Sequence, residues 1–158
     1  MNHQDTPWWQ GTRGEWWVAV QLALLAAIVL VPRVGPPGGP AWMRPLGWAG
    51  IAGGLTLIVL GRRTLGASAT IWPRPPADAI LVQEGIYRVV RHPIYSGLIC
   101  DGIGVALWRA SLLHLALTAL LAVVLDAKAR REERWLTERF PDYALYRATV
   151  RKFIPGIY

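Results

Sequence analysis

Charged residues are scarce in this chain, and cysteine is almost absent. Of its 158 residues only 17% are charged, whereas 53% are hydrophobic, an unusual balance for a soluble globular domain. The single cysteine, Cys100, lies inside an apolar block and has no intrachain partner, so a disulfide framework is excluded. The apolar residues come in long blocks that do not alternate with polar ones, and this pattern predicts membrane-spanning helices.

Sequence motifs of the common nucleotide-binding and hydrolytic folds are also missing. The nearest approach to a G-x-G-x-x-G run begins at Gly102 and has Leu107 in place of the third glycine. Because no strand–helix alternation surrounds it, a Rossmann domain is excluded. No Walker loop, G-x-S-x-G elbow or H-E-x-x-H motif occurs. The net charge of +7 comes without zinc spacing or a nucleic-acid-binding motif, so we expect no nucleic acid and no metal among the partners.

Four apolar blocks predict an all-α integral membrane protein with about four transmembrane helices. They run from Trp16 to about Val34, from about Trp42 to Leu60, from Ile94 to Trp108 and from Leu112 to Leu125. A Gly/Pro-rich turn at 35–40 separates the first two. Tryptophans precede or open the first block as an interfacial belt: Trp8, Trp9, Trp16 and Trp17. Small residues in the second block predict a bare face for close helix packing: Gly47, Gly50, Gly53 and Gly54.

Only three residues, 109–111, join the third and fourth blocks, and this predicts a helical hairpin. Beyond Leu125 the pattern becomes amphipathic. The fourth helix should therefore leave the membrane and continue to Pro141, followed by an aromatic tail that forms a cytoplasmic helical cap. Lysines and arginines gather between the second and third blocks and after the fourth. The positive-inside rule then predicts that both termini and both charged regions are cytoplasmic.

The hairpin should bring two polar clusters together on that side of the membrane. The first stands where the third block begins and contains Arg88, Arg91, His92 and Tyr95. The second, Glu132 and Glu133, follows the fourth block. Pro93 suits the first turn of a helix, which places His92 near the N-cap, where the helix dipole favours an anion such as a ligand carboxylate. Either cluster alone could be a solvated interface, but together they favour a pocket for a zwitterion.

Three motifs follow one another in the second half of the chain. The run from Gly85 to Gly97 has the form G-x-Y-x-x-x-RHP-x-Y-x-G, a Glu-Glu-x-x-Leu motif begins at Glu132, and Phe153-Ile154-Pro155 ends an aromatic-rich tail. In this order they resemble the isoprenylcysteine carboxyl methyltransferases and related membrane phospholipid methyltransferases. The resemblance covers residues 85–158, about half of the chain.

This resemblance implies a membrane methyltransferase that uses S-adenosylmethionine and acts on a lipid or lipid-modified acceptor, such as the carboxylate of an isoprenylcysteine. Residues 61–158 would be the methyltransferase-like catalytic region, preceded by two N-terminal transmembrane helices in residues 1–60. The active site would face the cytoplasm. The implied cofactor-binding residues are Tyr87, Arg88, His92, Tyr95, Glu133 and Tyr146, and the implied catalytic residues are Arg91 and Glu132.

Two ionisable residues inside the apolar blocks call for partners, because a charge at membrane depth is costly. Asp101 either lines a substrate tunnel or bonds to a neighbouring helix, whereas His114 is expected to serve the structure. Two other functions stay open beside methyl transfer. Membrane sterol reductases, which use NADPH, have an ending similar to residues 154–158 but are usually far longer, and a non-catalytic protein could bind anionic lipid through its arginines. The acceptor, whether carboxylate, amine or thiol, and the oligomeric state are not fixed by these residues.

Overall fold

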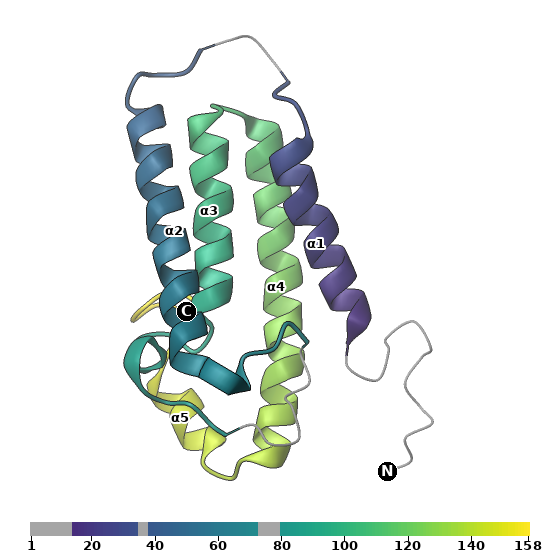
Figure 1. Cartoon of the computed structure of the whole chain (residues 1–158), viewed down its shortest axis with the longest axis vertical. Helices are drawn as coiled ribbons and strands as arrows, with labels where there is room; N and C mark the ends of the chain where they lie inside the picture. Colours follow the sequence, from purple (N-terminus) through teal and green to yellow (C-terminus); the bar gives the residue numbers. More distant parts are fainter. Residues whose placement is uncertain (1–13, 35–37, 73–79) are drawn as a thin grey trace.

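The computed structural model describes residues 14–34, 38–72 and 80–158, and their regular elements are helices. The α-helices are α1 (Glu15–Leu30), α2 (Met43–Leu65), α3 (Pro93–Trp108), α4 (Leu112–Arg139) and α5 (Tyr143–Thr149), with short 3₁₀ turns η2 (Gly66–Ser68) and η3 (Gly85–Arg88). The first four α-helices form an elongated bundle, and α5 lies beside its lower end (Figure 1). The all-α prediction is therefore confirmed. Trp8, Trp9 and positions 35–37 of the predicted turn lie outside the described residues.

Two predicted helix ends were wrong, each for a local reason. The first helix stops at Leu30 instead of running to Val34, because Val31 takes an extended conformation ahead of Pro32. The second helix continues five residues beyond Leu60 and ends where Gly66 takes a positive φ of 53°. Arginine is a good helix former, so the two arginines after residue 61 did not mark the end of the helix.

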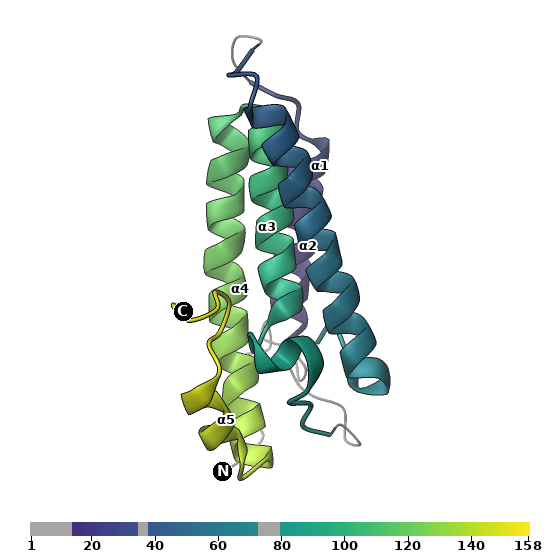
Figure 2. The same ribbon diagram turned by 90° about the vertical axis from the view of Figure 1, so that its left-hand side faces the viewer.

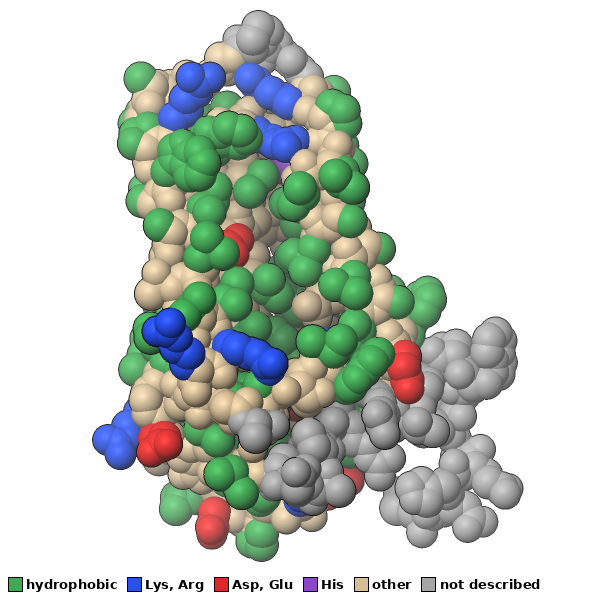
Figure 3. Space-filling model, viewed as in Figure 1, with side chains coloured by type: hydrophobic (Ala, Val, Ile, Leu, Met, Phe, Trp, Pro, Cys, Tyr) green, Lys and Arg blue, Asp and Glu red, His purple; other side chains and the backbone are tan. Residues whose placement is uncertain are grey.

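Two of the helices, α2 and α4, are long and apolar enough to cross a membrane. The helices α1 and α3 have 16 residues each, which gives a length of about 24 Å. Only 11% of the most apolar stretch of α2 and 33% of that of α4 is buried within the protein. Apolar side chains spread along the visible face of the bundle in Figure 3. This outward-facing apolar surface is typical of contact with lipid rather than of the core helices of a soluble protein.

The hairpin of α3 and α4 is built as predicted, with a tight turn in which Ala110 has a φ of 45°. Arg109 holds the turn against α1 by donating to the carbonyls of Val29 and Val31, at 2.9 and 2.6 Å. His114 is fully buried and contacts both Arg109 and the Ser111 hydroxyl. His114 therefore serves the structure of this turn, as expected. Below it, α4 continues without a break to Arg139, as the amphipathic pattern predicted.

Glycines let α2 approach the backbone of α3 closely, and Figure 2 shows the two helices side by side. A Cβ atom on Gly47 would lie 2.7 Å from the carbonyl oxygen of Gly104, and one on Gly54 would lie 2.6 Å from that of Gly97. The predicted small-residue face is thus confirmed at these positions. Gly53 does not belong to it, because a Cβ atom there would meet nothing within 4 Å.

Candidate functional site

The start of α3 is held by the C-terminal tail. Residues 90–92 pair with 151–152 through a parallel bridge, in which the amides of Arg91 and His92 donate to the carbonyls of Arg151 and Lys152 at 2.8 and 3.1 Å. The Ser96 hydroxyl adds a bond to the Phe153 carbonyl at 2.8 Å. His92 is the N-cap of α3 and Pro93 occupies its first turn, as predicted. The tail therefore fixes the direction in which the first side chains of α3 point.

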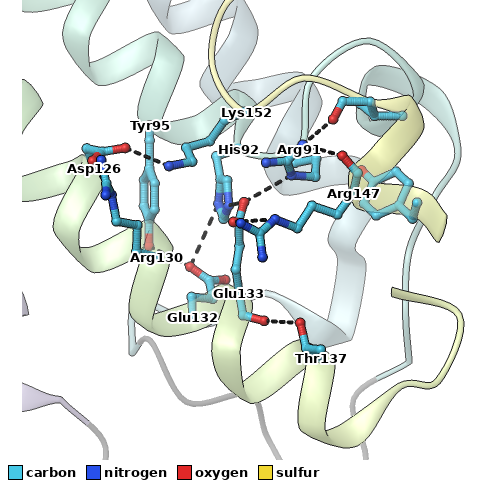
Figure 4. Close-up of polar contacts among 12 residues, drawn as sticks. Arg91, His92, Tyr95, Asp126, Arg130, Glu132, Glu133, Thr137, Arg147 and Lys152 are labelled. Carbon is cyan, nitrogen blue, oxygen red and sulfur yellow. Dashed lines mark hydrogen bonds and ion pairs between the residues drawn. The ribbon is translucent and has the colours of Figure 1, made fainter. Parts of the chain in front are cut away.

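Glu133 is a buried carboxylate at the centre of the polar contacts (Figure 4). Its side chain is 2% exposed, and its Oε1 accepts from Arg91 Nε at 2.9 Å and lies 3.1 Å from His92 Nε2. Arg147 Nε is 3.6 Å from the other oxygen. Burial alone would raise the pKa of Glu133, but the hydrogen bonds and charges of His92 and Arg91 outweigh it and lower this pKa to about 2. Glu133 is therefore an anion at neutral pH.

Arg91 connects the beginning of α3 to α4 and α5. Besides its ion pair with Glu133, its guanidinium donates to the carbonyl oxygens of Arg147, at 3.1 Å, and Val150. A planar guanidinium with five donors suits such a many-sided contact better than an ammonium would. Arg91 thus fixes the position of α5 relative to the hairpin.

Glu132 contacts the same histidine from a less buried position (Figure 4). Its side chain is 25% exposed, and His92 Nδ1 lies 3.9 Å from its Oε2. The same oxygen accepts from the Tyr95 hydroxyl at 2.9 Å. The rings of His92 and Tyr95 are parallel to within 2°, with centroids 5.3 Å apart. The predicted convergence of the two polar clusters is therefore confirmed, and the neighbouring glutamates occupy different surroundings.

A cavity of about 430 Å³ opens beside Glu132, a size typical of small-molecule sites. We call it the site cavity. Its polar wall includes six of the predicted site residues: Tyr87, Arg91, His92, Tyr95, Glu132 and Tyr146. Its apolar wall is formed by aliphatic side chains of α2, α3 and the intervening connection: Ile58, Leu65, Ile71, Ile80, Leu81 and Ile94. A ligand in it would meet charges of both signs, aromatic rings and a hydrocarbon-like surface.

Three predicted site residues do not line the cavity. Glu133 lies behind its wall, and Arg88 is exposed on η3. Asp101 lies farther along α3, where its Oδ1 would be 2.1 Å from a Cβ atom placed on Gly54 of α2. This oxygen is buried without a hydrogen-bond partner in the described part of the chain. Asp101 therefore sits at the α2–α3 contact, and its role in a tunnel stays a prediction.

Three tyrosines, Tyr87 of η3 and Tyr143 and Tyr146 of α5, line the cavity and keep their hydroxyl protons. Burial, the first cause for each, raises the pKa of Tyr87 and Tyr143 strongly and that of Tyr146 to about 12. The Tyr146 hydroxyl donates to the Tyr87 carbonyl at 2.6 Å. These groups can act as hydrogen-bond donors, but not as bases at neutral pH. Tyr143 was not among the predicted site residues, and the aromatic composition of the tail was the signal for it.

Gln21 and Lys128 also line the cavity and were not predicted. Gln21 comes from α1 and Lys128 from α4, and their side chains form a hydrogen bond of 2.6 Å. The available signals were that Gln21 is a polar residue inside an apolar block, and that Lys128 lies four residues, or about one helical turn, before Glu132.

The chemistry of this wall fits S-adenosylmethionine. The cofactor is a zwitterion with a third charge on sulfur and an aromatic base. The cavity offers Arg91 and the N-terminal end of α3 for a carboxylate, Glu132 for an ammonium or sulfonium, and aromatic faces. Within residues 14–34, 38–72 and 80–158, no group of three His, Cys, Asp or Glu side chains is placed to hold a metal ion.

Comparison with known proteins gives two findings. The sequence model of the family described as phospholipid methyltransferase matches residues 42–143, which is more than half of the chain. The cobalt-zinc-cadmium resistance protein CzcN of Cupriavidus metallidurans is 35% identical over 81 residues, covering 49% of this chain. The match spans only 36% of that relative's length. The family match includes α2, α3, α4 and the first residue of α5, but not α1 or the tail.

Proposed function

Because the chain belongs to the phospholipid methyltransferase family, we propose that it is a membrane methyltransferase that uses S-adenosylmethionine and acts on a lipid or lipid-modified acceptor. The observation that carries this proposal is the composition of the site cavity, in which Glu132, His92 and Tyr95 face an apolar wall. A water-soluble cofactor and a hydrocarbon chain need such unlike surfaces next to each other. When bound, S-adenosylmethionine would supply an activated methyl group on a positively charged sulfur.

The polar wall would bind and orient the cofactor. We assign His92 and Tyr95 to its amino-acid end, beside the first turn of α3, and Tyr87 and Tyr146 to the closure of the cavity over its adenosine. Glu133, behind the cavity wall, and Arg91, which lines it, would act mainly by position, because Glu133 binds both Arg91 and His92 and so fixes the histidine. Arg88 would contribute only if the connection before η3 moved it toward the cavity, since it is exposed.

Glu132 would be the catalytic carboxylate. It faces the cavity, and the Tyr95 hydroxyl fixes the direction of one of its oxygens. If the acceptor is an amine, Glu132 can take the proton that the amine must lose before its lone pair is available. If the acceptor is a carboxylate, no base is needed at neutral pH, and Glu132 would only align the reacting groups. In either case Glu132 would help to hold the acceptor with its lone pair directed at the methyl group that the bound cofactor would supply.

In the membrane, we propose four spans with the site cavity on the cytoplasmic side. The distribution of lysine and arginine supports this orientation, with both termini cytoplasmic. The helices α1 and α3 have only 16 residues each. The bilayer would accommodate them by thinning locally, or flanking residues would extend them to the interface. A lipid acceptor would then enter sideways between helices, while the cofactor would enter from water. Asp101 would lie along the lipid route only if the α2–α3 contact opened.

Calorimetry of the purified protein in maltoside micelles tests the proposal. We expect binding of S-adenosylhomocysteine and none of NADPH. Binding of NADPH alone would favour the reductase, and binding of neither would favour a non-catalytic lipid-binding protein. With labelled S-adenosylmethionine and a lipid extract, His92→Ala and Glu132→Ala should abolish methyl transfer, whereas Glu138→Ala, at an exposed position of α4, should not. Full activity in both site variants would refute the assignment.

A further inference from the structure

Lys128 is a buried cation that lines the site cavity, and the function proposed above gives it no role. It lies on α4 one turn before Glu132, and the residue is 1% exposed. Its Nζ donates to Gln21 Oε1 at 2.6 Å and to the Ile71 carbonyl at 3.0 Å, and lies 5.2 Å from the centre of the Tyr95 ring. All three partners are neutral. No salt bridge joins it to a carboxylate of the described residues.

A buried ammonium without an ion pair is costly. Burial lowers the pKa of Lys128 to about 8, although the charge of Glu132 opposes this shift. At neutral pH the ammonium is therefore still mostly protonated. An ammonium has three N–H donors, and the two hydrogen bonds use two of them. One donor without a hydrogen bond and a positive charge without an ion pair are left at the cavity wall, which is the environment that an anionic ligand group completes.

The position of Lys128 separates it from the proposed cofactor wall. It approaches one face of the Tyr95 ring, whereas the hydroxyl at the end of that ring binds Glu132. On its other side Lys128 reaches Ile71, which belongs to the apolar wall. A second cation, Arg62 of α2, lines the same cavity. An anion bound by Lys128 would thus stand where the polar and apolar walls meet, as the headgroup of an amphiphile would.

We propose that Lys128, held in place by Gln21, is the residue that binds the anionic group, phosphate or carboxylate, of an amphiphilic methyl acceptor. The inference rests on the proposed methyltransferase function. Gln21 lies on α1, outside the region 42–143 that the family shares. Recognition of the acceptor in this chain would therefore depend on a helix that the family match does not cover.

Binding of simple amphiphiles to the full chain in neutral maltoside micelles tests this inference, with S-adenosylhomocysteine present at saturation. The probes are dodecyl phosphate, dodecanoate, dodecanol and dodecyltrimethylammonium, with inorganic phosphate as the probe without a chain. We expect dodecyl phosphate or dodecanoate to bind at least about tenfold more tightly than dodecanol, as a charge-assisted hydrogen bond predicts. Preference for phosphate or for carboxylate identifies the headgroup. Equal affinity for dodecanol, or tighter binding of the cationic probe, would overturn the inference.

Two variants and a control locate the effect. Lys128→Met should remove the preference for the anionic probes and leave the affinity for S-adenosylhomocysteine within about twofold. Gln21→Leu keeps the Lys128 ammonium but removes the side chain that holds it in place. This variant should weaken the binding of the anionic probes by about threefold or more, and it remains a test even if Lys128→Met does not fold. Arg134→Met removes an exposed cation of the same helix and should change neither affinity.

The two proposals fail differently. If Lys128→Met loses S-adenosylhomocysteine and keeps the anionic amphiphile, Lys128 belongs to the cofactor and the inference is wrong. If the wild-type protein never binds S-adenosylhomocysteine, the methyltransferase proposal fails, and with it the naming of the amphiphile as an acceptor. In that case, selective binding of the anionic amphiphile that disappears in Lys128→Met would still identify Lys128 as part of an anion-binding site.

Discussion

Replacing Glu133 by glutamine tests whether this carboxylate holds the polar network together. The substitution keeps the shape of the side chain and removes its charge. Arg91 and His92, at 2.9 and 3.1 Å from Oε1, would then face a neutral amide. Because the side chain is only 2% exposed, water cannot replace the lost partner. We expect a folded but less stable protein.

The size of the effect follows from the pKa. The contacts lower the pKa of Glu133 from 4.5 to about 2, and a difference of this size corresponds to about 3 kcal/mol. Since the pKa is lower in the folded state, the stabilisation is complete above about pH 4.5 and is lost as the pH falls toward 2. The difference between wild type and Glu133→Gln should therefore be about 3 kcal/mol at pH 7 and less than about 2 kcal/mol at pH 3.

Unfolding in mixed maltoside and dodecyl sulfate micelles, followed by the fluorescence of the nine tryptophans, measures this difference. Glu138→Gln, at an exposed position of the same helix, controls for the loss of one charge and should behave as wild type at both pH values. A Glu133→Gln protein as stable as wild type at pH 7 would refute the reasoning. So would a loss of stability that is the same at pH 3 as at pH 7, because it would not come from the ionised carboxylate.

Three further predictions follow from the geometry. Glu132→Gln should lower methyl transfer by about a hundredfold or more without loss of folding, as measured with labelled cofactor; unchanged transfer would contradict its catalytic role. Gly54→Ala should cost about 2 kcal/mol in the same unfolding assay, because its Cβ would lie 2.6 Å from the Gly97 carbonyl, whereas Gly53→Ala meets open space and should cost nothing. Tyr146→Phe loses a 2.6 Å hydrogen bond to η3 and should cost about 1 kcal/mol; equal stability would indicate that water replaces it.

Much of the fold could be predicted because hydrophobic blocks and short connections leave few arrangements. The three-residue turn at 109–111 forces α3 and α4 to be antiparallel, and Arg91 and His92 therefore meet Glu133 across 41–42 positions of sequence. Helix ends were less predictable, since they depend on single residues such as Pro32 and Gly66. A helix can also be longer than its apolar block, as the polar second half of α4 demonstrates.

The different roles of Glu132 and Glu133 could not be predicted, because they depend on how α4 is rotated. Adjacent residues of a helix point about 100° apart, so one of two neighbouring glutamates can face the cavity while the other faces protein. That rotation is fixed by contacts from elements without any motif: α1 through Gln21, and the tail through Lys152, which pairs with Asp126 of α4 at 2.7 Å. A motif thus identifies the residues of a site, whereas the surrounding helices decide which of them reaches the ligand.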